Sequence, residues 1–192
     1  MNLTIARSAR SGPTTIALLL ALLMVTTRFH HFGSLTHLPD ASLAVFFLGG
    51  FYLRRPALFG CYLAQAALID YLAITLGGVS DWCVTPAYAF LVPTYASLWF
   101  GGLWYARRHR MDWRTLAPLA GAVFVAVSAA FLISNASFYV LSGYFPAMSW
   151  TEYATRVARY FPPYASAAVA YIAIAAGLHV LATTAGARSQ RA

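Results

Sequence analysis

The most reactive side chain in the sequence is the thiol of Cys83, in a short connection (residues 80–86) between two long apolar stretches. Asp81 and Trp82 precede it directly. Such a thiol is half of a disulfide, a ligand for a soft metal, or a residue without chemical use. The carboxylate of Asp81 would oppose deprotonation of the thiol, so a bound metal would have to drive it.

Cys61 is the one possible disulfide partner within the chain, because the sequence holds two cysteines. It lies near the start of the apolar stretch that ends at Gly78, about 25 Å away along a helix axis. A disulfide needs Cα atoms within about 7 Å. We therefore expect Cys83 to be a free thiol. The sequence also lacks the Cys-x-x-Cys pair of a disulfide or quinone oxidoreductase.

Asp70 is the only acidic residue well inside an apolar stretch, roughly 12 Å from its end. A charge at this depth in a membrane costs at least a few kcal/mol unless it is paired or hydrated. Asp70 is therefore either a functional group or a buried acceptor that fixes helix packing. Tyr88 is expected at a similar depth in the next stretch and is a candidate partner.

Other chemistries fit the sequence less well. Cys83 and three histidines have the side chains of a zinc site, although adjacent histidines usually point apart; the three are His30, His31 and His37. A bis-haem cytochrome needs paired histidines inside apolar stretches, where only His179 lies, and no Gly-x-Ser-x-Gly sequence of a serine hydrolase occurs. His109 stands among arginines and is interpreted as part of a solvated charge cluster.

The composition indicates that these residues are held by membrane helices. The 192 residues are 60% hydrophobic and 9% charged, which exceeds the apolar content that a soluble core can hide. Six stretches approach the roughly 17–25 residues of a membrane span, namely 13–27, 38–53, 57–78, 86–105, 116–134 and 161–184. The first two are short, and the second contains Gly49 and Gly50.

These stretches predict an all-α integral membrane protein, a single domain over residues 1–192 built as a bundle of six transmembrane helices. All 13 basic residues are arginines, and ten of them fall on one predicted side, namely Arg7, Arg10, Arg54, Arg55, Arg107, Arg108, Arg110, Arg114, Arg188 and Arg191. Only Arg28, Arg156 and Arg159 fall on the other. The positive-inside rule then places both termini in the cytoplasm, with flexible tails at 1–12 and 185–192. Arginines placed between apolar stretches also argue against a nucleic-acid partner.

The three predicted outer segments, 28–37, 80–86 and 135–159, are rich in aromatic residues, whereas the inner ones are short and basic. Aromatic side chains with a few polar groups form either a belt at the lipid headgroups or the wall of a site for a large, partly apolar ligand. We favour the ligand site for the set as a whole. Trp82, Thr85, Tyr139 and Arg156 are its candidate contacts in the second and third segments.

The chain resembles the substrate-binding (S) components of energy-coupling factor (ECF) vitamin transporters, which have six short-looped helices and an outer site. More narrowly, the segment GVSDWCVTPAY (residues 78–88), with Asp70 before it, resembles the BtuM family of solitary S-components for cobalamin (vitamin B12) in Gram-negative bacteria. The resemblance extends over essentially the whole chain. It implies a transport protein of the inner membrane with a periplasmic site, not an enzyme.

The resemblance also implies roles for single residues. Cys83 matches the loop cysteine that coordinates cobalt of a base-off corrinoid, and the sulfur–cobalt bond would promote loss of an upper cyanide. Asp70, Tyr88 and His31 would contact the corrin amides or the nucleotide tail. Arg156 is a candidate contact to the phosphate for a separate reason, its outward position against the charge rule. The small-residue pattern Ala17-x-x-x-Ala21 resembles the motif that docks S-components onto the transmembrane ECF subunit.

Energy for uptake would have to come from partners, because the chain has no lysine and hence no Walker A sequence. An ECF module of a transmembrane subunit and ATPases is the implied partner besides cobalamin and the lipid bilayer. Two alternatives stay open: an S-component for another vitamin, with Cys83 incidental, and a membrane protein that decyanates the corrinoid.

Overall fold

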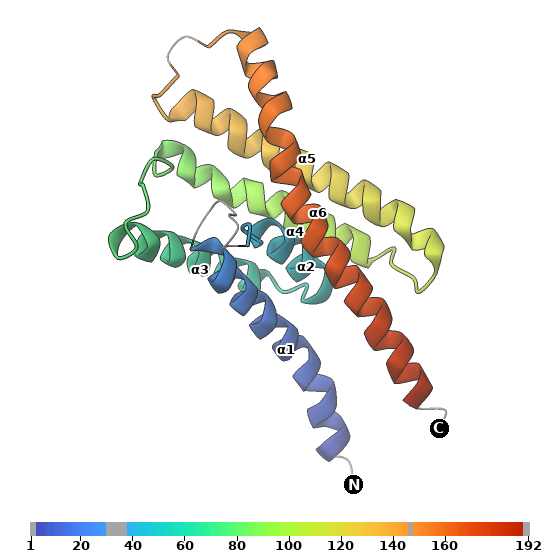
Figure 1. Ribbon diagram of the computed structural model, residues 1–192. Coiled ribbons are helices and arrows are strands. Elements are labelled where there is room, and N and C mark those ends of the chain that lie inside the picture. Colours follow the sequence, from blue (N-terminus) through green and yellow to red (C-terminus); the bar gives the residue numbers. More distant parts are fainter. Residues whose placement is uncertain (1–2, 30–37, 146–147, 190–192) are drawn as a thin grey trace.

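The computed structural model describes residues 3–29, 38–145 and 148–189, and every regular element in these ranges is a helix (Figure 1). The six α-helices are α1 (Leu3–Arg28), α2 (Ser42–Tyr52), α3 (Pro56–Thr75), α4 (Leu91–Ala106), α5 (Leu116–Leu141) and α6 (Trp150–Ser189). Two 3-10 helices, η1 (Pro86–Phe90) and η2 (Trp113–Thr115), directly precede α4 and α5. The all-helical class predicted from the sequence is confirmed for these residues.

Three helical segments of the described chain are long and apolar enough to cross a membrane, and they indicate a membrane protein. They are Pro56–Thr75, Trp113–Leu141 and Trp150–Gly186. The apolar helices Gly12–Arg28 and Ser42–Tyr52 are shorter. With 11 residues, α2 rises only about 16 Å, roughly half of the hydrocarbon core. For the described residues, the prediction is therefore confirmed as an all-helical protein with three candidate spans, and six spans are not confirmed.

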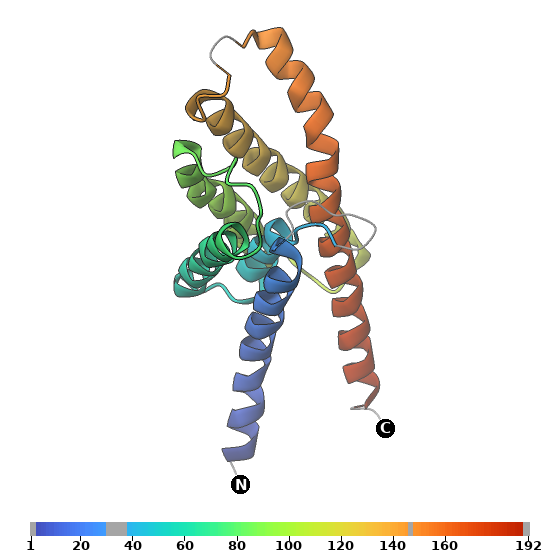
Figure 2. The ribbon, with the colours of Figure 1, turned by 60° about the vertical axis from the view of Figure 1, so that its left-hand side comes forward.

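The short helix α2 lies at the centre of the bundle, where it contacts α1, α3, α4 and α6 (Figures 1 and 2). Eight of its 11 residues are buried. Gly49 and Gly50, which suggested a weak or broken span, instead let α4 pack closely. A Cβ on Gly50 would overlap the backbone carbonyl of Trp99, and one on Gly102 would overlap that of Phe47.

This packing predicts that Gly50→Ala destabilises the protein, because α2 and α4 must separate to admit the methyl group. We expect a loss of about 1–3 kcal/mol in the free energy of unfolding, read as a lower thermal midpoint in detergent. Gly121 in α5 is the matched control, since a Cβ there meets nothing within 4 Å. Gly121→Ala should leave the midpoint unchanged or raise it, and equal midpoints for the two variants would contradict the packing.

The two helices around the third predicted outer segment are longer than expected. The segment was placed at 135–159, but α5 continues to Leu141 and α6 begins at Trp150. Tyr139 and Arg156 therefore lie on helices rather than in a loop. The predicted span began at residue 161, whereas α6 begins at Trp150 and continues through Pro162 and Pro163.

Candidate functional site

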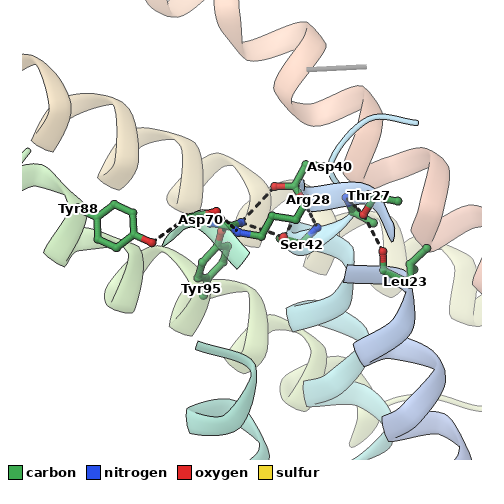
Figure 3. Close-up of polar contacts among 9 residues, drawn as sticks. Leu23, Thr27, Arg28, Asp40, Ser42, Asp70, Tyr88 and Tyr95 are labelled. Carbon is green, nitrogen blue, oxygen red and sulfur yellow. Dashed lines mark hydrogen bonds and ion pairs between the residues drawn. The ribbon is translucent and has the colours of Figure 1, made fainter. Parts of the chain in front are cut away.

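A buried cluster of polar side chains surrounds Arg28, the last residue of α1 (Figure 3). Its side chain is 4% exposed. Nε and Nη2 donate to the two carboxylate oxygens of Asp70 in α3, at 2.8 and 2.7 Å. Nη1 donates to Tyr95 Oη (2.6 Å), Ser42 Oγ (3.0 Å) and Asp40 Oδ2 (3.2 Å). One guanidinium thus joins α1, the start of α2, α3 and α4.

Hydrogen bonds at the start of α2 hold Asp40 and Ser42 beside this guanidinium. Asp40 Oδ1 accepts from the backbone N–H of Ser42 at 2.8 Å and from its hydroxyl at 2.6 Å. Thr27 Oγ1 donates to the Leu23 carbonyl at 2.8 Å and accepts from the N–H of Ala41 at 3.1 Å. Hydrogen bonds between α1 and the start of α2 therefore bring Asp40 to Arg28, and the cluster holds two carboxylates for one guanidinium.

Arg28 is the functional residue that sequence reasoning missed, because it was counted as a charge in the first outer segment. The structure corrects this placement: Arg28 belongs to α1, and its guanidinium is buried against Asp70. Two features of the sequence pointed to this pairing. Arg28 lies on the predicted side that has few arginines, and Asp70 is an acid without an evident partner in another apolar stretch. An arginine deep enough to neutralise that acid satisfies both observations.

Asp70 and Tyr88 are in contact, as their predicted depths suggested. Tyr88 Oη donates to Asp70 Oδ2 at 2.7 Å. Asp70, whose side chain is 7% exposed, therefore accepts from Arg28 and from Tyr88. Its first role in this structure is to join helices, and any contact with a ligand would be additional to that role.

The loop that carries Cys83 runs from residue 76 to residue 85, between α3 and η1. It leaves α3 through Gly78, whose φ of 66° favours glycine, and the N–H of Val79 returns to the Ala73 carbonyl at 3.1 Å. It ends at Thr85, whose Oγ1 accepts from the N–H of Ala87 at 3.3 Å and caps η1. Thr85, predicted as a ligand contact, thus has a structural role in this loop.

Cys83 is a free, exposed cysteine, and so is Cys61. Partial burial of the sulfur raises the pKa of the Cys83 thiol, and the negative charge of Asp70 raises it further. Asp70 is thus the acid that opposes the thiolate, in place of Asp81, the neighbour considered from the sequence. The thiol is protonated at neutral pH, and a metal that binds it must displace the proton.

Aromatic side chains connect the Cys83 loop to the chain around the end of α5. Trp82 stacks on Tyr144, with ring centroids 3.7 Å apart and planes 6° from parallel. The ring centroid of Phe138 in α5 lies 6.0 Å from that of Tyr144. The Cys83 loop and the end of α5 both lie at the left of Figure 1. Two of the three predicted outer segments therefore meet, and most of the first one lies outside the described residues.

Arg156 of α6 lies at the same aromatic end. Its guanidinium is 5.7 Å from the Tyr139 ring and 5.1 Å from the Phe145 ring, and it pairs with Glu152 at 3.3 Å. A hollow of about 640 Å³ beside Arg156 is lined by Ser149 and the first part of α6. The hollow does not include Cys83, so the structure groups Arg156 with Tyr139 but not with the thiol.

Part of the predicted ligand set cannot be placed. His31 lies outside the described residues, as do His30 and His37, so the zinc alternative stays untested. Among the residues that the structure does describe, no three His, Cys, Asp or Glu side chains form a metal-binding group. A single thiolate ligand to a metal that arrives inside a larger cofactor does not require such a group.

His109 and His179 form a second cluster, between α2, α4 and α6. Their rings are 5.2 Å apart. His109 Nδ1 is 3.0 Å from Tyr105 Oη, and His179 Nδ1 is 3.1 Å from Tyr52 Oη. Burial lowers the pKa of His109, and His179 lowers it further. The interpretation of His109 as a solvated charge was therefore wrong, because its ring packs between helices.

Comparison with known proteins identifies no relative: no family model matches the chain, and no curated protein matches it.

Proposed function

We propose that the protein is a membrane subunit for the uptake of cobalamin, in which the Cys83 thiolate binds the cobalt of a base-off corrinoid. The observation that carries the proposal is a free, exposed thiol in a loop held beside a group of aromatic rings. Thiolate is a good ligand for a soft or strongly covalent metal centre. The BtuM-like segment at residues 78–88 supplies the choice of cobalt.

The chemistry of the surrounding residues supports a corrinoid as the ligand. A corrin ring is broad and apolar and is fringed by amides, which suits aromatic walls with a few polar groups. Trp82 and Tyr144 offer the apolar surface next to the thiol. Tyr139 and Arg156 offer a ring and a cation on the neighbouring helices, where Arg156 would meet the phosphate of the nucleotide tail. His31 and Tyr88 are proposed contacts to the amides or the tail.

The proposed setting is a bacterial inner membrane, with six spans, both termini in the cytoplasm and Cys83 on the periplasmic side. In this arrangement α2 would cover only half of the bilayer by itself, and its burial by four neighbours would spare it contact with lipid. Transport would depend on a separate energising module. Ala17 and Ala21 of the implied docking motif face α3 in this structure, because their carbonyls accept from Tyr62 Oη and Gln65 Nε2, so docking is not assigned to them.

The proposal is tested by titrating the purified protein in detergent with cobalamin and recording the visible spectrum. We expect a saturable change at one cobalamin per chain, with no comparable binding of flavin or thiamine. Binding of another vitamin without a cobalamin response would favour the alternative S-component. Release of more than one cyanide from cyanocobalamin per chain would favour a decyanating protein. No binding at all would contradict the proposal.

The raised pKa of Cys83 predicts that coordination strengthens with pH. Binding as a thiolate releases one proton, so the apparent affinity should rise about tenfold per pH unit below the thiol pKa and level off above it. Affinity rises with pH because the proton, which partial burial and Asp70 hold on the thiol, competes with cobalt for the sulfur. The check is a series of titrations between pH 6 and about pH 9. A flat profile would show that the thiol is not the ligand.

A further inference from the structure

The loop that carries Cys83 is closed at its base by one side-chain hydrogen bond. The loop is flanked by α3, which carries Asp70, and by η1, which carries Tyr88. The 2.7 Å bond from Tyr88 Oη to Asp70 Oδ2 therefore joins the chain before the loop to the chain after it. At its tip the loop has a second attachment, the stack of Trp82 on Tyr144.

Arg28 sets the position of the acceptor in this bond. Its Nε and Nη2 bind both oxygens of Asp70, and such a two-point contact fixes the plane of the carboxylate. The oxygen that accepts from Tyr88 is the one that accepts from Nη2. The guanidinium is itself held by Tyr95, Ser42 and Asp40 from α4 and the start of α2. Figure 3 shows this chain of contacts from Tyr88 to Asp40.

We propose that Arg28 is a positioning residue for the Cys83 loop. It holds Asp70 as the acceptor for Tyr88, and the Tyr88–Asp70 bond holds the base of the loop so that the thiol stays in one place. The effect of Arg28 on cobalamin binding rests on the proposed function. Its effect on the position of the Cys83 loop does not depend on that function. The consequence is that a residue on α1 controls a thiol on the connection between α3 and η1.

The partners of Arg28 separate this role from simple helix packing. Tyr95 accepts from the same guanidinium at 2.6 Å, but it lies on α4, which does not flank the Cys83 loop. Tyr88→Phe removes the bond at the base of the loop and leaves every charge in place. Tyr95→Phe removes a neighbouring bond of the same guanidinium, keeps the stack on Phe46, and leaves the loop bond intact.

The experiment measures the rate at which iodoacetamide alkylates Cys83 in a Cys61→Ser background, so that a single thiol reacts. The rate is followed as a function of pH, and its plateau above the thiol pKa reports access to the sulfur rather than ionisation. Thermal unfolding in detergent shows that each variant is folded. Tyr88→Phe and Arg28→Lys should raise the plateau rate at least about fivefold, the effect of one lost hydrogen bond on a local opening. Tyr95→Phe should leave it unchanged.

The double variant Arg28→Lys/Tyr88→Phe tests whether the two residues act through one bond. If they do, its plateau rate equals that of the Tyr88→Phe single variant. Rates that multiply, or an equal rise in Tyr95→Phe, would overturn the proposal. If Arg28→Lys does not fold, Asp70→Asn replaces it. The amide has one acceptor oxygen, so it cannot make the two-point contact with the guanidinium of Arg28.

The same variants separate this inference from the proposed function. Alkylation needs no cobalamin, so its outcome stands even if Cys83→Ala binds cobalamin like the wild type. If cobalamin binds through Cys83, Tyr88→Phe and Arg28→Lys should weaken coordination by a similar factor and Tyr95→Phe should not. Unchanged coordination in the first two variants would overturn the role of Arg28 in binding.

Discussion

Arg28→Met is expected to lower the free energy of unfolding by about 3–5 kcal/mol, more than the loss expected for Gly50→Ala. The substitution leaves Asp70 buried without its guanidinium and removes the shared partner of Asp40, Ser42 and Tyr95. A buried carboxylate that loses its cation must become protonated or stay charged in a poorly solvated place. The measurement is unfolding in detergent, followed by circular dichroism.

Two companion variants identify the cause of this loss. Arg28→Met/Asp70→Leu removes both charges of the central pair and should recover part of the stability. Arg156→Met breaks the contact with Glu152 and should cost much less stability than Arg28→Met, since the two side chains are 34% and 50% exposed. Equal losses for Arg28→Met and Arg156→Met would contradict the buried cluster.

Cys83→Ala is expected to reduce the affinity for cobalamin on the order of 100-fold or more. Loss of a residue that merely supports a metal ligand already costs about 10–100-fold, and Cys83 is proposed to be the ligand itself. The fold should be unaffected, because Cys83 is exposed and makes no disulfide. The check is an equilibrium titration monitored by the visible spectrum, with Cys61→Ser as the matched control that should bind like the wild type.

The helices could be predicted from hydropathy, because apolar stretches bounded by arginines are recognisable without tertiary information. The spacing of Asp70 and Tyr88 around the Cys83 loop also predicted their contact, since both lie a short distance from the same end of neighbouring helices. These inferences depend on local sequence and on helix geometry alone.

The remaining features depend on non-local packing. The side chain of an arginine at the end of an apolar stretch usually extends to the lipid headgroups. Nothing near Arg28 in the sequence shows that its guanidinium instead binds Asp70. The burial of α2 depends on the close approach of α4 at Gly50 and Gly102. The predicted start of α6 came too late, because three charged residues precede the apolar stretch, namely Glu152, Arg156 and Arg159.

The sulfur–cobalt bond is tested most directly by the cobalt K-edge X-ray absorption spectrum of the protein–cobalamin complex. A thiolate ligand predicts one sulfur scatterer in the first coordination shell of the wild-type complex. That scatterer should be absent when the same measurement is made with Cys83→Ala at a saturating cobalamin concentration. A shell of nitrogen and oxygen alone in the wild-type complex would contradict the proposed coordination.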